Sequence, residues 1–266
     1  MAPPTTVLVD TTASIDLCLA DISPITGVQP SKLALDLEGV KLSRNGRVSI
    51  VQIFADTSNT IWLIDITTLG RVAFDHKDSH GQSLRYVFQN PNTKKVMIKW
   101  FSPSSVTYKV IQLLFDVRND ADALWNIYRI DLANVYDLQL LDIASRRSRR
   151  IPIRIVNGLA KCIEHYVKPR KEWKKVKEEG KALFAPVNGG SYAIFEQRPL
   201  DARILAYCAQ DVALMFQLEA AMKRKMGNKG KGWDERIVVA SANRVAESKN
   251  SKYEGRAASR IIAPVF

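Results

Sequence analysis

The first half of the chain alternates between apolar runs and turn sequences, a pattern typical of β-strands. Asn45-Gly46 and Ser58-Asn59 separate three apolar runs, so an antiparallel meander is expected there. Two more strands are expected at Lys95 to Phe101 and Val110 to Phe115, with a helix near Gln82 to Gln89 before them. The three runs of the meander are Lys32 to Leu37, Val48 to Ala55 and Thr60 to Ile66.

The second half changes to a helical period. Leu200 to Met222 is the clearest predicted helix, because its apolar residues recur every three or four positions. Asp137 is expected to cap the helix that follows it. Strands followed by helices predict an α/β domain with a mixed sheet flanked by helices. The other expected helices are Asp120 to Tyr128, Leu138 to Ser145 and Ile155 to His165.

The same pattern divides the chain into three parts. Residues 1–30 are expected to be a lead-in with one possible helix at Ala13 to Ala20, and residues 31–222 form the domain. Residues 223–266 are basic and weakly periodic, so a loosely held tail is expected.

Composition narrows the possible chemistry. The chain has 266 residues, of which 46% are hydrophobic and 25% charged, as in a globular protein. No apolar stretch is long enough to cross a membrane, and the first ten residues do not resemble a secretory signal, so an intracellular protein, cytoplasmic or nuclear, is expected. Three cysteines without a CxxC pair and three scattered histidines argue against disulfides and zinc, which leaves carboxylates to hold any metal.

Two acids separated by one residue, Asp36 and Glu38, end the first apolar run. In a strand, alternate side chains share a face, so the two carboxylates point the same way and repel each other. A divalent cation between them removes that repulsion, and hard oxygen ligands suit Mg²⁺ or Mn²⁺. The alternative is a solvated strand face on which two acids need no metal.

Other acids fall where they could complete such a site. Tyr207 and Asp211 are four residues apart on the strongest helix, so they share one face of it. Asp120 opens an earlier helix, where an acid is also expected from the helix dipole alone, and Asp122 is an alternative to it. Four acids from separate elements suit two Mg²⁺ or Mn²⁺ ions shared with a phosphodiester, and a tyrosine hydroxyl suits the orientation of a water molecule.

The formal charge of +12 points to an anionic partner, most often nucleic acid. Thirteen Lys and Arg residues lie between Ser145 and Lys181. The alternative for this run is a solvated helical surface with its aromatic residues in the core. The residues expected to bind nucleic acid are Arg146, Arg147, Arg149, Arg150, Arg170, Lys171, Trp173, Lys174 and Lys175.

Taken together, the set Asp36-x-Glu38, Asp120 and Tyr207-x-x-x-Asp211 resembles the DEDDy-type 3′-to-5′ exonucleases, the ribonuclease D-like family. The resemblance covers about residues 31–222. It departs from the family pattern before Asp120, where the chain has Phe115-Asp116-Val117-Arg118-Asn119 in place of the usual His-Asn or His-Gly.

The resemblance implies a ribonuclease H-like fold and a 3′-to-5′ exonuclease that acts on single-stranded nucleic acid, with RNA favoured over DNA. It implies that Asp36, Glu38, Asp120 and Asp211 hold two Mg²⁺ or Mn²⁺ ions, and that Tyr207 positions the attacking water. The alternative is a catalytically silent relative that serves as an RNA-binding scaffold or interaction module. A proofreading domain would need a polymerase, and the chain has no polymerase sequence.

Overall fold

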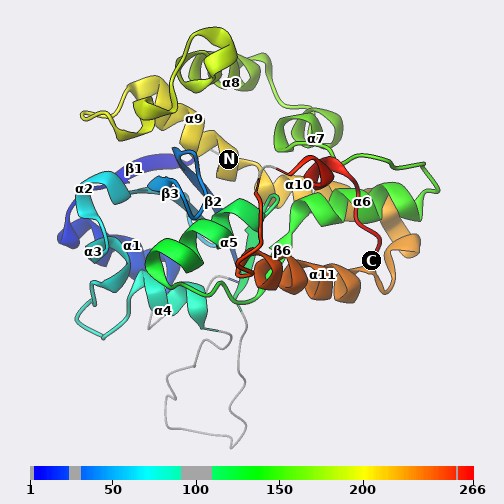
Figure 1. Ribbon diagram of the computed structural model, residues 1–266, viewed down its shortest axis with the longest axis horizontal. Helices are drawn as coiled ribbons and strands as arrows, with labels where there is room; N and C mark the ends of the chain where they lie inside the picture. Colours follow the sequence, from blue (N-terminus) through cyan, green and yellow to red (C-terminus); the bar gives the residue numbers. More distant parts are fainter. Residues whose placement is uncertain (1–2, 24–30, 91–109, 256) are drawn as a thin grey trace, which may run out of the picture.

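The computed structural model describes residues 3–23, 31–90, 110–255 and 257–266. Their strands form one mixed sheet of six strands in the order β1-β4-β3-β2-β5-β6 (Figure 1). The strands are β1 Thr5–Val9, β2 Lys32–Val40, β3 Arg47–Ala55, β4 Thr60–Asp65, β5 Ile111–Leu114 and β6 Val135–Asp137.

The predicted antiparallel meander is confirmed. β2 pairs antiparallel with β3, and β3 pairs antiparallel with β4. β5 then pairs parallel with β2, and β6 pairs parallel with β5, which makes the sheet mixed as expected. The strand expected at Lys95 to Phe101 lies outside the described residues.

The predicted lead-in is part of the sheet. β1 pairs parallel with β4, with Thr5 opposite Thr60 and Val9 opposite Ile64. The helix expected near Ala13 is α1, Thr12–Ile22, and it begins with a capping box in which the Thr11 hydroxyl accepts a hydrogen bond from the Ser14 amide.

Helices cover both faces of the sheet, and each face has its own hydrophobic core. Leu33, Leu35 and Leu37 of β2 enter one core, which α1 and α5 complete. Ala34 belongs to the other core, together with residues of α6, α9 and α10. This split follows from the two-residue period of a strand. The helices between the strands are α2 Ile66–Leu69, α3 Val72–Asp75, α4 Leu84–Gln89 and α5 Arg118–Ala123, which continues into the π-helical segment η1, Leu124–Tyr128.

The later helices differ in part from the prediction. Asp137 caps α6 as expected, through a hydrogen bond from the Gln139 amide. The single helix predicted over Leu200 to Met222 is two helices, because the chain leaves helical geometry at Leu214. The later helices are α6 Leu138–Ser148, α7 Leu159–Tyr166, α8 Lys171–Phe184, α9 Ala202–Ala213, α10 Met215–Met226 and α11 Trp233–Ser248, with short η2 Pro186–Asn188, η3 Tyr192–Glu196, η4 Gly227–Gly230 and η5 Ala258–Ile261.

The expectation of a loosely held C-terminal tail is wrong. α11 packs against α5, α6 and β6 and buries Ile237 and Val245. Two buried polar residues of α11, Ser241 and Arg244, bond to Asp137 at the end of β6. The weak apolar period of this helix hid it, because much of its contact with the domain is polar.

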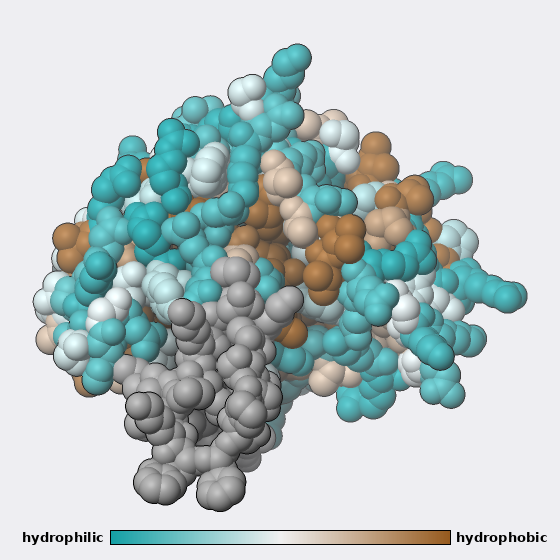
Figure 2. Space-filling model, turned by 90° about the horizontal axis from the view of Figure 1, so that it is seen from below, coloured by the Kyte–Doolittle hydropathy of each residue, from teal (hydrophilic) through white to brown (hydrophobic). Residues whose placement is uncertain are grey.

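The surface and the cysteines agree with the composition. The face seen in Figure 2 is mainly hydrophilic, with hydrophobic side chains gathered in separate patches. In the described part of the chain, no helix combines the length and apolarity that crossing a membrane requires. Cys18, Cys162 and Cys208 are buried free thiols, as expected.

Candidate metal centre

Three acids from two elements meet at one point beside the sheet. Asp36 and Glu38 project from β2 on the face that α9 covers, and Asp211 comes from α9. One carboxylate oxygen of each acid lies within 4.8 Å of the others. Asp211 is buried, and Asp36 and Glu38 are partly buried. This spacing suits a hard divalent cation held by oxygen ligands.

In the described part of the chain, the one cation paired with the cluster, Lys177, does not cancel the repulsion among the three acids. Burial, and then the charge of Asp211, raise the pKa of Asp36 to about 8, although Lys177 acts in the opposite direction. Burial and the charge of Asp36 also raise the pKa of Glu38. Buried acids that raise one another's pKa favour a bound cation, which would return them to the ionised form.

Asp120 is not one of the three acids that meet in the cluster, but it is close enough for the charge of Asp36 to act on it, whereas Asp122 is bonded elsewhere. Burial, and then the charge of Asp36, raise the pKa of Asp120 on α5. Asp122 accepts hydrogen bonds from the backbone amide and the Nε of Arg44, both at 2.7 Å, and from the side chain of Asn126. The carboxylate of Asp122 is therefore occupied by protein donors, and Asp120 is the acid available to a cation.

Tyr207 lies against Asp211 as the helical spacing predicts. Burial raises the pKa of Asp211, and the neighbouring Lys177 ammonium and then the Tyr207 hydroxyl lower it in part. Burial and the charge of Asp211 raise the pKa of Tyr207, so its hydroxyl remains protonated. Phe184 meets the Tyr207 ring edge to face at 5.0 Å.

α8 covers this side of the cluster and packs very closely against α9. A Cβ atom added to Gly180 would lie 2.6 Å from the Tyr207 ring, so only glycine allows α8 to pack this closely on α9. One turn earlier, the ammonium of Lys177 pairs with Asp211 and lies 3.9 Å from the centre of the Tyr207 ring. No sequence pattern distinguishes Lys177 from the other basic residues of its segment.

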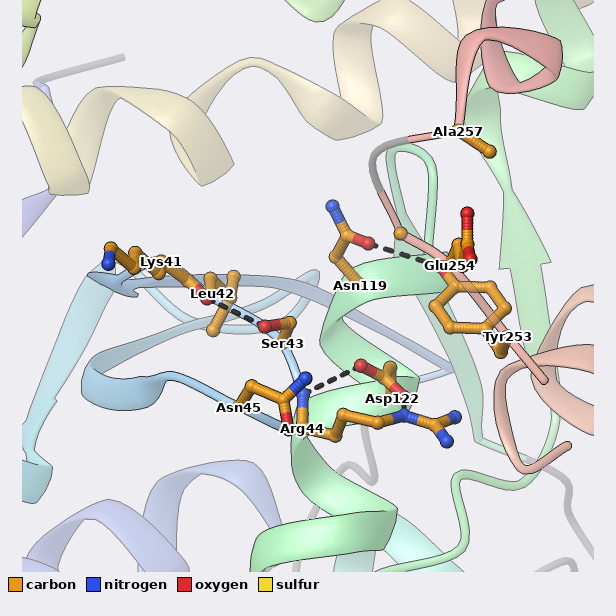
Figure 3. Close-up of a pocket in the computed structure, with 11 residues that line it drawn as sticks. Lys41, Leu42, Ser43, Arg44, Asn45, Asn119, Asp122, Tyr253, Glu254 and Ala257 are labelled. Atoms are coloured by element: carbon orange, nitrogen blue, oxygen red, sulfur yellow. Dashed lines mark hydrogen bonds and ion pairs between the residues drawn. The ribbon is translucent and has the colours of Figure 1, made fainter. Parts of the chain in front are cut away.

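A cavity of about 420 Å³ opens between the segment after β2, the start of α5 and the C-terminal segment (Figure 3). Asn119 and Asp122, on either side of Asp120, line it together with residues 41–45. Across the cavity, Tyr253 donates a hydrogen bond to the side-chain oxygen of Asn119 at 3.1 Å.

The predicted nucleic-acid-binding residues divide into an exposed set and an engaged set. The exposed set is Arg150, Arg170, Lys171, Lys174 and Lys175. Arg146 forms an ion pair with buried Asp142, Arg147 bonds to the carbonyl of Pro264, and Arg149 bonds to the carbonyl of Ser145.

The expectation for Trp173 does not fit the structure. Its side chain is 8% exposed and belongs to the hydrophobic core on the α9 side of the sheet. An indole buried in this way has no face free for a base. Trp173 instead follows the alternative for this run, in which the aromatic residues lie in the core.

Comparison with known proteins identifies a family for part of the chain. Residues 106–227 match the family model described as 3′-5′ exonuclease. A comparison with curated proteins finds no match.

Solved structures with the same fold include nucleases. Trypanosoma brucei RNase D, in a GMP complex, aligns with a TM-score of 0.71 and 18% identity over 97% of this chain and 69% of that one. The same protein in complex with RNA U12 gives 0.70 and 18% over 98% and 77%. Brucella melitensis NrnC with bound Mg²⁺ gives 0.58 and 14% over 97% and 100%.

The family match and the shared fold confirm the resemblance to the ribonuclease D-like, DEDDy-type exonucleases. They also confirm the ribonuclease H-like fold and the enzyme class, a hydrolytic 3′-to-5′ exonuclease. The roles of individual site residues remain predictions.

Proposed function

We propose that this protein removes nucleotides from the 3′ end of single-stranded nucleic acid, with RNA preferred over DNA, by two-metal-ion catalysis. The observation that carries the proposal is the cluster of Asp36, Glu38 and Asp211, whose oxygens lie within 4.8 Å of one another while their pKa values are raised by burial and mutual repulsion. We assign Asp120 as the fourth acid, because the charge of Asp36 raises its pKa while Asp122 is engaged elsewhere.

The donor set fits Mg²⁺ or Mn²⁺. Asp36, Glu38, Asp120 and Asp211 supply only hard carboxylate oxygens, and no histidine or cysteine belongs to the described cluster. When bound, two such ions activate a water molecule and stabilise the leaving oxygen of an in-line displacement.

Tyr207 has the position and the protonation state to orient the attacking water. Its hydroxyl lies beside Asp211, and its raised pKa keeps the proton on the oxygen. The hydroxyl therefore serves as a donor that fixes the position of the water beside the carboxylates. The contact with Gly180 holds the ring in place.

The exposed basic residues at the start of α8 would supply positive charge for the phosphate backbone of the substrate. Trypanosoma brucei RNase D is described in complexes with RNA U12 and GMP, which supports an RNA substrate and a mononucleotide product here.

The decisive experiment uses 3′- and 5′-labelled single-stranded RNA and DNA of the same sequence, with Mg²⁺, Mn²⁺ or EDTA. We expect 5′-labelled RNA to shorten in single-nucleotide steps, 5′-labelled DNA to shorten more slowly, and EDTA to stop both. A protein that binds RNA but leaves it intact with every metal would be a scaffold, and the proposal would be wrong.

A second experiment tests the exposed basic set. Reversal of Arg170, Lys171, Lys174 and Lys175 to Glu should weaken binding of RNA and DNA alike, because interactions with the phosphate backbone carry no base information. The slope of log affinity against log salt should become shallower by about 0.7 for each phosphate that the protein no longer neutralises. Reversal of four exposed basic residues outside α8, Arg129, Arg224, Lys229 and Lys231, is the matched control for net charge. Equal salt slopes in the two variants would show that the basic residues at the start of α8 do not contact the substrate backbone.

A further inference from the structure

Lys177 occupies the place where a cation is needed. Among the described residues, it is the one cation joined by an ion pair to the cluster of Asp36, Glu38 and Asp211. Its ammonium bonds to the Oδ1 atom of Asp211, and its charge lowers the pKa of Asp36 and Glu38 as well. The side chain is only 15% exposed, so water screens this charge poorly.

The backbone around Lys177 leaves its ammonium little freedom. Gly180 brings α8 so close to α9 that the ring of Tyr207 forms one wall beside the ammonium, 3.9 Å from the ring centre. The face of an aromatic ring attracts an ammonium independently of any carboxylate. Lys177 therefore has two partners, the Asp211 carboxylate and the Tyr207 ring, and can lose the first while it keeps the second.

A metal ion and Lys177 need the same carboxylate group. A divalent cation held by this cluster takes a carboxylate oxygen of Asp211, and the ammonium of Lys177 now bonds to that carboxylate. Two cations at one buried carboxylate repel each other strongly. The ammonium must therefore withdraw from Asp211 when a metal binds.

We propose that Lys177 is a displaceable counter-ion of the metal centre: it balances the acids in the metal-free protein, competes with the metal for Asp211, and keeps Tyr207 in place through the ring contact. Lys177 is a positioning residue in this proposal, because it acts through Asp211 and Tyr207. The proposal rests on the proposed function, since it assumes that the acids bind metal.

The test measures metal binding without nucleic acid. The Kd for Mn²⁺ is determined by electron paramagnetic resonance of the free ion for the wild type, Lys177→Met and Lys177→Gln. Because a charge-assisted bond no longer has to break, we expect Lys177→Met to bind Mn²⁺ about ten- to a hundredfold more tightly. Lys177→Gln keeps a polar donor and should bind more tightly than the wild type by a smaller factor.

Lys181→Met is the matched control. It removes the same charge from the same helix one turn later, at an exposed position. Its Kd for Mn²⁺ should stay within about twofold of the wild type, because solvent screens an exposed charge.

Thermal unfolding supplies an independent readout. In EDTA, Lys177→Met should have a lower Tm than the wild type, because the variant leaves Asp211 buried without its cation. Saturating Mn²⁺ should raise the Tm of Lys177→Met more than that of the wild type. If Lys177 were only structural, the variant would have a lower Tm than the wild type by the same amount in EDTA and in Mn²⁺.

The outcomes separate this inference from the proposed function. Wild-type protein that binds Mn²⁺ with the same Kd as Lys177→Met would overturn the inference alone. Wild-type protein that binds no Mn²⁺ at millimolar concentration would overturn both. If Lys181→Met bound Mn²⁺ as tightly as Lys177→Met, the effect would come from net charge alone, and this result would also overturn the inference.

Discussion

Asp137 and the cluster of Asp36, Glu38 and Asp211 differ in how the protein balances their negative charge. Asp137 is fully buried, and protein donors satisfy it: the backbone amides of Asp116, Val117 and Gln139, at 2.9 to 3.1 Å, and the guanidinium of Arg244, at 2.7 Å. Asp36, Glu38 and Asp211 face one another instead, and Lys177 is their one ion-pair partner among the described residues.

The contrast distinguishes an acid whose hydrogen bonds stabilise the fold from acids that have few protein donors and could bind a cation. Asp137 joins the start of α5 to β6 and α11, so its bonds fix the segment that carries Asp120. The cluster acids repel one another, and the ion pair of Asp211 with Lys177 offsets this repulsion only in part. Burial alone would not separate the two groups, whereas the number of protein donors does.

A change in the cluster tests the metal site directly. Asp36→Asn removes a proposed metal ligand and one of the repelling charges, so nuclease activity should fall by about a hundred- to a thousandfold, as for removal of a major transition-state interaction. The Tm in EDTA should stay the same or rise. Single-turnover cleavage of labelled RNA, together with thermal unfolding, measures both. Wild-type activity in this variant would show that Asp36 is not a ligand.

The opposite result is expected at Asp137. Asp137→Ala leaves Arg244 buried without its partner and frees three amides, so the free energy of unfolding should fall by about 3–5 kcal/mol. Urea unfolding in EDTA measures the change. Asp10→Ala, at an exposed position, is the control and should stay within about 0.5 kcal/mol of the wild type. Equal losses in the two variants would refute the distinction between the two groups of acids.

Tyr207→Phe tests an interaction at the edge of the cluster. The ring and its packing against Gly180 remain, and only the hydroxyl beside Asp211 is removed. The rate of cleavage should fall by about a hundredfold to ten-thousandfold, the range for a group that positions or proton-couples a nucleophile. The Kd for Mn²⁺ should change little. An unchanged single-turnover rate would make Tyr207 a packing residue.

A change of pH tests the protonation state of the cluster in the metal-free protein. The pKa of Asp36 is raised to about 8, from an ordinary value of 3.8, so between these values the folded protein keeps a proton that the unfolded chain has released. Stability in EDTA therefore falls as pH rises through this range. Scans of Tm from pH 5 to pH 8 should show a decline in the wild type that is flatter in Asp36→Asn. Identical slopes would mean that Asp36 is already ionised in the metal-free protein.

The sequence predicted the features that depend on local pattern. The meander follows from alternation and turn residues, and the shared face of Asp36 and Glu38 follows from the two-residue period of β2. The spacing of Tyr207 and Asp211 on α9 also needed only helical geometry.

The features that the sequence did not predict depend on contacts between distant segments. The pairing of β1 with β4 joins residues 55 positions apart, from Thr5 to Thr60. The bonds from α11 to Asp137 cross about a hundred residues, and an amphipathic pattern does not report polar contacts of this kind. Trp173 and Lys177 lie in one basic run, and only the packing of α8 on α9 separates the core residue from the residue at the acids.

The contact between Gly180 and Tyr207 also restricts how related sequences can vary. Any side chain at position 180 would push α8 away from α9 and draw the ammonium one turn earlier out of reach of Asp211. A larger residue at position 180 would therefore require a smaller residue at position 207 to keep the two helices at this distance. Lys-x-x-Gly ahead of Tyr-x-x-x-Asp is thus a compound motif by which proteins with this arrangement can be sought in sequence collections, and its two halves should be inherited together.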